Sequence, residues 1–426
     1  MTYKRILIVC ELYYPLNTIG AIRPSKLARY LQAEGYRVDV FTATELSRPE
    51  YHADAGYRIV SCFGVDTAEA PEKKPQRNSK IAVHKRGKLL TELAMTRRQW
   101  VQYCKSGVFL QQFRHAVASG NIDLANYDCI FTTFGPVGSV LIGLEAKRMR
   151  PELRWICDFR DPMVSKIMPK CFVPFYGYLQ RKSIRLADCV TTVSYGYKKR
   201  IMPRNGLDKC LVIPNGYDPD DEKLLAQAQR DSKFSFAYVG SLYEGKRDLS
   251  LLFRAIREMI DSGKMDAEKI RFHYAGDEIA FLRQQAQPYD LEAIIDDHGR
   301  MTHEACMALQ ASVRFLVMST WNEKGEEGVF PGKLIEYMLM KKPVINITNG
   351  ELPNCEVTQV IRELELGVSC EEADSESYTA LTRWLEAQCS AFHAGQAAIF
   401  QPKTEEIEAR YNWKNIIKRF GELIDG

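Results

Sequence analysis

The feature that most constrains this chain is the repeated alternation of short apolar runs with longer stretches of helical periodicity. The apolar runs are rich in β-branched residues and carry no polar alternation, as at 5–10, 154–158 and 234–239. Continuous apolarity of this kind is typical of parallel strands that are covered on both faces. Stretches of helical periodicity separate them, for example 24–34 and 332–340. The pattern predicts an α/β protein built on doubly wound parallel sheets.

The length of the chain suits two such sheets. A chain of 426 residues is long enough for several domains of about 100–200 residues, each with a core of its own. Turn-forming residues cluster in the sequence PRNGLDK, which predicts a domain break near 205–209. We expect a first domain over 1–207, a second over 208–404, and a basic amphipathic helix in 405–426 that packs back on the first domain. Further strands are predicted at 37–42, 58–62, 129–132, 189–193, 210–213, 270–275, 313–317 and 343–347, and further helices at 137–148, 249–262 and 303–311.

Composition and charge exclude several classes of protein. The 58 Lys and Arg residues nearly balance the 54 Asp and Glu residues, and a net charge of +4 is too small for a dedicated nucleic-acid binder. No run approaches the roughly 18 consecutive apolar residues of a transmembrane helix. The amino-terminal run meets Glu11 and Pro15 without the small-residue cleavage site of a signal peptide. The 12 cysteines are scattered without a C-x-x-C pair, which favours a reducing, cytoplasmic location.

One segment departs from this balance. Between 73 and 114 there are eleven Lys or Arg residues against a single acid, Glu92, and aromatic residues such as Trp100 and Phe109 are interleaved with them. One interpretation is a solvated linker and helix face. The other is a basic patch that contacts anionic lipid headgroups or a phosphorylated acceptor. Nucleic acid is the least favoured partner, because the rest of the chain lacks a nucleic-acid-reading module.

Two loops in the first half of the chain are candidate binding elements. The first predicted strand runs into a loop with Gly20, and a helix is predicted to open at Pro24, close to Arg23. Such a loop either binds a phosphate group or is only a structural turn, and neither a dinucleotide fingerprint nor a P-loop is present. The second loop, in WICDFRDP, brings Asp158 and Arg160 to the end of a strand. Its charged residues either satisfy one another as ion pairs or place a carboxylate beside a reacting hydroxyl.

The second half of the chain contains two glycine-bearing loops with cations. In FAYVGSLYEGKRD, Gly240 follows a strand, and Lys246 and Arg247 precede a helix, so that these cations are suited to neutralise a pyrophosphate. In GEEGVFPGKLIEYMLMKKPVI, Lys333 lies in the first turn of a helix and Glu336 one turn further. Glycine amides, a lysine and a glutamate at one helix start suit a nucleotide sugar. The alternative is a surface capping pattern.

The order of these motifs resembles a known family. VIPNGYDP, FAYVGSLYEGKRD, YAGD and GVFPGKLIEYMLMKKPVI resemble the carboxyl half of group 1, family 4-like, retaining glycosyltransferases with the GT-B fold. FTTFGPVGSVLIG, CDFRDP, RLADCVTTVS and the closing YNWKNIIKRF are similar to the branch that builds bacterial surface polysaccharides. The resemblance implies two Rossmann-like doubly wound domains that face each other across a cleft. It also implies transfer of a sugar, with retention, from a nucleoside-diphosphate donor to a glycan or lipid-linked acceptor.

The resemblance also implies the conditions of the reaction. It implies transfer without a required metal, and no cofactor is expected beside the nucleoside-diphosphate sugar, which is a co-substrate. UDP is expected as the base before GDP. The enzyme would work in the cytoplasm, at the cytoplasmic face of the inner membrane. Two rival hypotheses share the fold: a nucleotide-sugar epimerase, and a non-catalytic nucleotide-sugar-binding protein. The acidic run at 218–221 is not expected to bind metal, because it follows PNG in a turn and matches the family's NG-x-D-x element.

Individual roles follow from the same resemblance. Glu336 matches the second glutamate of the family's E-x7-E motif and is expected to bind the donor ribose, whereas the first glutamate falls at Gly328. The backbone amides of Val329 and Phe330 are expected to stabilise the leaving pyrophosphate in its place. The family's basic pair becomes Ser241 and Lys246. The complete set of predicted residues comprises Asp158, Asp161, Lys246 and Glu336 for catalysis; Gly20, Gly240, Ser241, Lys246, Arg247, Gly328, Val329, Phe330, Lys333 and Glu336 for the donor; and Arg23, Asp158 and Arg160 for the acceptor.

Overall fold

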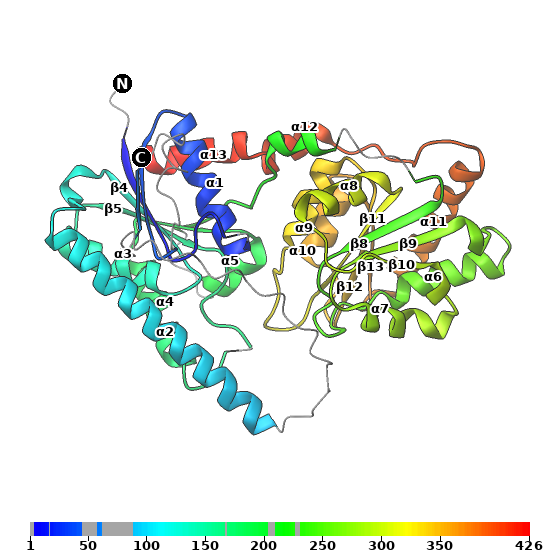
Figure 1. Ribbon diagram of the computed structural model, residues 1–426, viewed down its shortest axis with the longest axis horizontal. Coiled ribbons are helices and arrows are strands. Elements are labelled where there is room, and N and C mark those ends of the chain that lie inside the picture. The colour runs from blue at the N-terminus through cyan, green and yellow to red at the C-terminus, as the bar shows by residue number, and fades with distance from the viewer. Residues whose placement is uncertain are drawn as a thin grey trace. The chain divides into compact units, whose positions relative to one another are not determined.

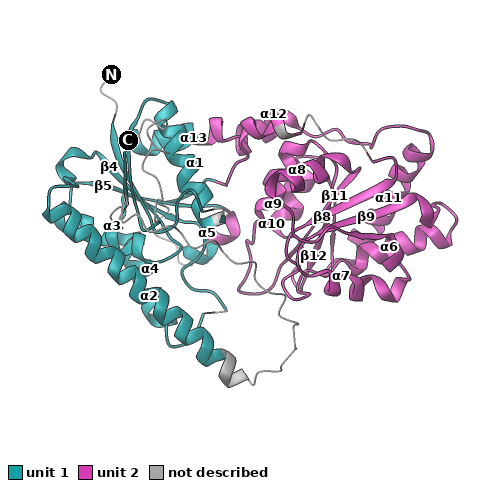
Figure 2. Ribbon diagram, in the orientation of Figure 1, with its two compact units in different colours: residues 1–193, 198–213, 417–426 teal, residues 194–197, 214–416 magenta. Residues whose placement is uncertain are grey.

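The computed structural model describes residues 4–16, 18–44, 58–61, 88–166, 168–202, 209–225 and 231–426. The chain forms two compact units (Figure 2). Unit 1 comprises residues 1–193, 198–213 and 417–426, and unit 2 comprises residues 194–197 and 214–416. Each unit contains a parallel sheet with helices on its faces (Figure 1).

The sheet of unit 1 has seven strands among the described residues, in the order β3-β2-β1-β4-β5-β6-β7. All neighbouring strands are parallel, and the strand order reverses between β1 and β4. In doubly wound sheets, ligands bind outside the carboxyl ends of the strands at such a reversal. The strands are β1 (Arg5–Cys10), β2 (Arg37–Thr42), β3 (Arg58–Ser61), β4 (Cys129–Thr133), β5 (Arg154–Phe159), β6 (Cys189–Thr192) and β7 (Cys210–Val212). The helices are α1 (Ile19–Ala33), α2 (Lys88–Ala118), α3 (Gly138–Met149), α4 (Val173–Leu186), α5 (Tyr195–Ile201), which continues from unit 2, and α13 (Trp413–Asp425), most of which belongs to unit 1.

The sheet of unit 2 has six parallel strands among the described residues, in the order β10-β9-β8-β11-β12-β13. Its order reverses between β8 and β11, so that the loops after these two strands meet at the same edge. The strands are β8 (Phe234–Val239), β9 (Ile270–Ala275), β10 (Ile295–Asp297), β11 (Phe315–Trp321), β12 (Val344–Asn349) and β13 (Gly367–Glu371). The helices are α6 (Ser250–Asp261), α7 (Ile279–Ala286), α8 (His303–Ser312), α9 (Gly332–Met340), α10 (Glu356–Glu363), α11 (Ser375–His393) and α12 (Thr404–Tyr411).

Burial of the strands explains their sequence. Residues 6–9 of β1 are completely buried, and every residue of β8 is buried. In unit 2 the core is aromatic: the Phe234 and Phe315 rings lie 4.9 Å apart, and Phe236 packs against Phe272. Strands covered on both faces need apolar side chains at consecutive positions, because neither face meets water. The predicted α/β architecture with parallel sheets is confirmed.

Several predicted boundaries are wrong for identifiable reasons. The first helix begins at Ile19 rather than at Pro24, which lies inside α1. Proline lacks the amide that an interior helix position donates, which is why the sequence favoured a start there. The edge strands β10 and β13 were not predicted, because both are short and carry polar residues that water can reach.

The closing segment is two helices rather than the predicted single one. Asn412 is extended, with φ −82° and ψ 127°, between α12 and α13. The Tyr217 amide donates to the carbonyl of Tyr411 at 2.8 Å, and the Trp413 amide donates to the carbonyl of Tyr217 at 3.2 Å. A strand-like bridge to Tyr217 therefore replaces the helical hydrogen bonds at this point. Within the described residues, no helix combines the length and the apolar character needed to cross a bilayer.

Candidate functional site

The loop after β8 is held in shape by a carboxylate from another loop. Gly240 (φ +126°) begins it, and the Glu278 side chain accepts hydrogen bonds from the three consecutive amides of residues 242–244, at 2.6, 3.2 and 2.8 Å. The Ser241 hydroxyl also donates to Glu278. Burial alone would raise the pKa of Glu278, but the hydrogen bonds from Ser241 and the amides lower it below its ordinary value. The predicted donor-binding Ser241 is thus engaged by Glu278.

The cations of this loop lie over an aromatic ring. Lys246 Nζ is 4.3 Å from the ring centroid of Trp321, and the Arg247 guanidinium carbon is 5.7 Å from it. Lys246 also forms ion pairs with Glu326, at 2.9 Å, and Glu323, at 3.4 Å. Because these carboxylates belong to the loop after β11, Lys246 joins the two loops that meet at the strand-order reversal of unit 2. The pairs are partly exposed, so an incoming anion can compete for Lys246.

The start of α9 carries the second predicted group. Lys333 Nζ contacts both carboxylate oxygens of Glu336, at 3.1 and 3.0 Å. Gln310 of α8, which is completely buried, donates to Glu336 Oε1 at 2.7 Å. These contacts hold the Glu336 carboxylate in one orientation while leaving it partly exposed.

Gly328 has no room for the glutamate that the resembled family carries at this position. Its φ is +86°, and a Cβ there would lie 2.5 Å from the backbone of Gly196. Ser194, which groups with unit 2, donates its hydroxyl proton to the Gly328 carbonyl at 2.7 Å. The backbone amides of Val329 and Phe330 have no hydrogen-bond partner among the described residues. Close backbone packing therefore requires glycine here and leaves two amides open.

The predicted acceptor residues of unit 1 include a buried ion pair. Asp158 is completely buried and accepts from Arg23 Nε at 3.0 Å and Nη2 at 2.9 Å. The hydroxyls of Thr133 and Thr191 donate to the same carboxylate at 2.9 and 2.7 Å. This geometry gives Arg23 and Asp158 a structural role, and their function toward an acceptor stays a prediction. Asp161, by contrast, is exposed.

The other residues of unit 1 lie near the same strand ends. Arg160 is buried between Gly20, in the first turn of α1, and the loop after β4. In unit 2, the acidic run at 218–221 begins a short 3₁₀ helix (Pro219–Leu224), where Asp218 accepts from the Asp220 amide at 3.0 Å. No group of His, Cys, Asp and Glu side chains among the described residues has the geometry of a metal site.

Two family descriptions match the sequence of this chain. Residues 233–386 match "Glycosyl transferases group 1", and residues 21–216 match "Glycosyl transferase 4-like domain". The chain belongs to the group 1 glycosyltransferases. No curated protein matches it.

Solved structures share the fold over nearly the whole chain. Sucrose-phosphate synthase from Thermosynechococcus elongatus is 16% identical, covers 99% of this chain and 98% of its own, and has a TM-score of 0.62. Trehalose-6-phosphate synthase OtsA is 11% identical, covers 99% of each chain and has a TM-score of 0.61. Alr3699/HepE from Anabaena, in complex with UDP-glucose, is 15% identical, covers 99% of this chain and 100% of its own, and has a TM-score of 0.56. The predicted two-domain Rossmann-like GT-B fold is confirmed.

Three residues of this glycosyltransferase were not singled out as site residues in the sequence. Glu278 and Trp321 shape the unit 2 loops. Glu278 closely follows β9 and Trp321 ends β11, and a position at the carboxyl end of a strand is the sequence signal for both. Glu11, at the end of β1, is buried and accepts from the Gly138 amide at 2.6 Å and the Ser106 hydroxyl at 2.8 Å. Burial raises the pKa of Glu11 to about 7, although the Ser106 and Gly138 hydrogen bonds oppose the shift.

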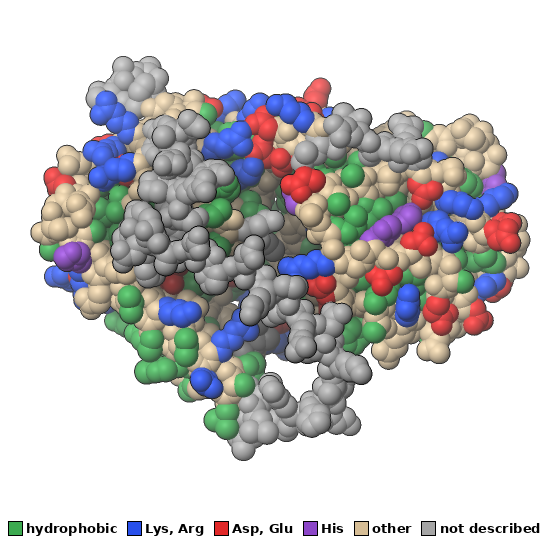
Figure 3. All heavy atoms as spheres, viewed as in Figure 1, with side chains coloured by type: hydrophobic (Ala, Val, Ile, Leu, Met, Phe, Trp, Pro, Cys, Tyr) green, Lys and Arg blue, Asp and Glu red, His purple; other side chains and the backbone are tan. Residues whose placement is uncertain are grey.

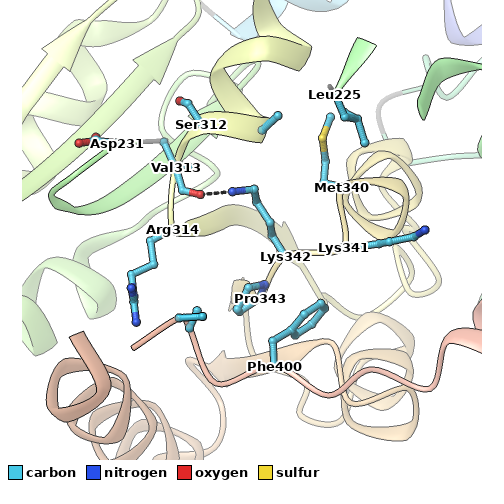
Figure 4. Close-up of a pocket in the computed structure, with 13 residues that line it drawn as sticks. Leu225, Asp231, Ser312, Val313, Arg314, Met340, Lys341, Lys342, Pro343 and Phe400 are labelled. Carbon is cyan, nitrogen blue, oxygen red and sulfur yellow. Dashed lines mark hydrogen bonds between the residues drawn. The ribbon is translucent and has the colours of Figure 1, made fainter. Parts of the chain in front are cut away.

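A cavity of about 540 Å³ lies at the opposite edge of the unit 2 sheet, at the amino ends of β11 and β12 (Figure 4). Its lining includes Arg314, Lys341 and Phe400, and Lys342 donates to the Val313 carbonyl. None of the residues predicted for the donor or the acceptor lines this cavity. The loops that carry the candidate site are at the carboxyl edge instead.

The basic segment forms part of the long helix α2, and residues 73–87 lie outside the described residues, with Lys85 and Arg86 among them. Apolar and basic side chains gather side by side over α2 (Figure 3). Trp100 is 59% exposed and lies beside the exposed Arg97 and Arg98. Phe109, in contrast, is buried against Phe41 at 5.1 Å, so the sequence interpretation that placed it on this surface is wrong.

Proposed function

We propose that this glycosyltransferase transfers a sugar, with retention of anomeric configuration, from a nucleoside-diphosphate sugar to a glycan or lipid-linked acceptor in surface polysaccharide synthesis. The observation that carries the proposal is the set of groups at the carboxyl edge of unit 2. Lys246 over Trp321, the open amides of 329–330 and the oriented Glu336 carboxylate suit the pyrophosphate and the ribose of such a donor. UDP is the first expectation for the base and GDP the second; Anabaena HepE was solved with UDP and glucose.

Lys246 would act by exchanging partners. Without an anion, its charge is balanced by Glu326 and Glu323. A donor pyrophosphate would take their place over Trp321, while Lys333 and Arg247 contribute further positive charge. These contacts strengthen as the glycosidic bond breaks and the leaving phosphate gains charge, so they favour the transition state over the bound substrate. The backbone amides of 329–330 would donate hydrogen bonds to the same leaving phosphate, in place of the family's first glutamate.

Glu336 would bind the ribose hydroxyls. Ribose recognition needs a carboxylate that is held in place but not fully enclosed, since it must accept hydrogen bonds from the ligand. Gln310 and Lys333 supply that fixation from two directions. Their contacts to Oε1 leave acceptor capacity at Oε2, which among the described residues contacts Lys333 alone, at 3.0 Å.

The reaction needs no enzyme nucleophile. In a front-face displacement, the bond from the anomeric carbon to the phosphate oxygen breaks and the bond to the acceptor oxygen forms on the same face. The proton of the acceptor hydroxyl passes to the departing phosphate oxygen. The exposed Asp161 is the remaining candidate for orienting that hydroxyl, because Asp158 is occupied by Arg23. We propose that no metal and no cofactor take part.

We also propose that the enzyme meets its acceptor at an anionic membrane, at the cytoplasmic face of the inner membrane. The surface concerned, the α2–α4 surface, consists of exposed apolar and aromatic residues of two helices joined by the Tyr103 and Phe175 rings, 5.2 Å apart. Each Lys or Arg near an anionic surface contributes about 1 kcal/mol. The residues are Leu93, Trp100, Val101, Val108, Phe175 and Tyr178, with Arg97, Arg98 and Lys105 beside them.

A panel of nucleoside-diphosphate sugars, scored for release of the nucleoside diphosphate with and without a lipid-linked acceptor, tests the proposal. Release that depends on acceptor supports transfer, and the configuration of the product, read by nuclear magnetic resonance, tests retention. Isomerisation of a donor without acceptor would indicate an epimerase instead. Binding of a donor with neither release nor isomerisation would indicate a binding protein.

A further inference from the structure

Arg160 occupies a cradle of glycines at the carboxyl edge of the unit 1 sheet. The residue is 9% exposed. A Cβ on Gly135 would lie 2.1 Å from Arg160 Nη2, and a Cβ on Gly20 would lie 3.0 Å from Nη1. Gly135 also has a φ of +115°, which other residues rarely adopt. A helix start and a loop, at Gly20 and Gly135, therefore carry glycine beside the guanidinium, although a Cβ on Gly20 would also lie 2.8 Å from Leu12 Cδ1.

The guanidinium is poorly satisfied for a group so deeply buried. Of its five N–H donors, one bonds to a described residue, in a long hydrogen bond of 3.4 Å from Nη2 to the Gly135 carbonyl. Nε is buried without a partner, and no described carboxylate forms an ion pair with Arg160. The contrast with Arg23 in the same unit is direct, since Arg23 is 1% exposed but is paired with Asp158 at 2.9 Å. A buried charge without an ion-pair partner destabilises the fold. A ligand of opposite charge would therefore be stabilised at Arg160.

The surroundings favour an anion. Gly20 lies in the first turn of α1, a helix of 15 residues whose N-cap residue, Thr18, forms no side-chain capping bond. The amino end of a helix carries partial positive charge and unpaired amides. The carboxylate of Glu11, which directly follows the strand β1, is already engaged by Gly138 and Ser106. The cradle also lies at the carboxyl ends of the strands, where ligands reach such sheets.

We propose that Arg160, with the first turn of α1, binds a phosphate oxyanion of a substrate in unit 1. The planar guanidinium offers two parallel N–H groups to a phosphate, which explains arginine at this position better than lysine would. The phosphate belongs either to the donor diphosphate or to the lipid diphosphate of the acceptor. The inference rests on the proposed function only for the identity of that substrate.

The test is titration of the full-length protein with inorganic pyrophosphate by isothermal calorimetry, in a Lys246→Ala background that weakens the predicted donor site. Adding Arg160→Gln is expected to weaken pyrophosphate binding at least tenfold, and Arg160→Lys by less. The matched control is Arg185→Gln, at an exposed arginine of α4, which should leave the affinity unchanged. In the unliganded protein, Arg160→Gln should unfold at the same temperature as the control or higher, because it removes an uncompensated buried charge.

Three outcomes would overturn the proposal: no pyrophosphate binding in the Lys246→Ala background, equal affinity in the Arg160→Gln and Arg185→Gln variants, or an unfolding temperature of Arg160→Gln well below the control. The last would assign Arg160 a structural role. The source of the phosphate is read from two further ligands, UDP and a short-chain isoprenoid diphosphate, since only the true source should depend on Arg160. If transfer fails with every donor but pyrophosphate binding still depends on Arg160, the proposed function falls and the anion site stands.

Discussion

Replacing Asp158 decides between a structural and a catalytic role for a residue that the sequence placed at the acceptor. The carboxylate accepts five hydrogen bonds of 2.7–3.3 Å, three of them from Arg23. With Asp158→Ala, the Arg23 guanidinium, 1% exposed, would lose the buried carboxylate that lies 2.9 Å from it. Removing one partner of a buried pair costs about 3–5 kcal/mol, a large part of the roughly 5–15 kcal/mol that stabilises a typical domain.

Urea unfolding, followed by circular dichroism and tryptophan fluorescence, measures this loss. Because the chain has two units, the loss is expected in one transition, that of unit 1, rather than across the whole curve. Asp161→Ala is the matched control, since Asp161 is exposed three residues away and should change stability by less than about 0.5 kcal/mol. The double variant Arg23→Met/Asp158→Leu should recover most of the stability, because neither charge is then buried.

A different result would refute this reasoning. If Asp158→Ala unfolds at the same urea concentration as the wild type but abolishes transfer, the pair is not a structural element. Asp158 would then act in catalysis, as the sequence predicted.

Four further predictions concern the site and the surface. Lys246→Ala and Glu336→Ala should each reduce kcat/KM for the donor by an amount equivalent to about 1.5–3 kcal/mol without affecting unfolding, and wild-type kinetics in both would contradict the assignment. Transfer should persist in saturating chelator; an absolute requirement for Mg²⁺ or Mn²⁺, restored by adding the ion back, would contradict this. The pKa of Glu11 is raised from 4.5 to about 7, so between these pH values the folded state holds a proton that the unfolded state releases. The free energy of unfolding should therefore fall by up to about 3 kcal/mol between pH 4.5 and 7. Glu11→Gln should remove this pH dependence in urea titrations at several pH values. The protein should sediment with anionic liposomes at low salt and be released at high salt, where the screening length falls below about 8 Å. Reversing the charges of Arg97 and Arg98 should weaken sedimentation. Equal binding to neutral vesicles would argue against the α2–α4 surface.

The sequence predicted the presence of most helices and strands but only some of their boundaries. The predicted boundaries are correct for strands β1, β2, β8 and β9 and for helix α9. Pro24 shows the limit of local signals, because the sequence favoured a helix start at this residue and the helix begins five residues earlier, at Ile19. Asn412 shows it again, since the break between α12 and α13 exists only because the backbone of Tyr217, almost 200 residues earlier, bonds there.

The sequence likewise predicted some features of the candidate site and missed others. Motif order alone indicated which loops carry glycines, cations and carboxylates, because the carboxyl ends of parallel strands converge whatever the details of the fold. It could not indicate that Asp158 is paired with Arg23, or that Glu278 accepts hydrogen bonds from the amides next to Ser241. Nor could it indicate that Gly328 packs against the backbone of Gly196.

By itself, then, the sequence determined the layered α/β architecture, the family and the edge of each sheet at which chemistry can occur, since these follow from hydrophobic periodicity and from residues close together in the chain. Only the tertiary structure decided which charges are neutralised and which stay uncompensated. Arg23 and Arg160 look alike in the sequence, yet Arg23 is paired with a carboxylate, whereas Arg160 forms no ion pair with the described residues and donates only to the Gly135 carbonyl. The reason is physical: the energy of a buried charge depends on partners that folding brings from distant segments. No local sequence pattern gives the distance to those partners or the solvent exposure of the charge.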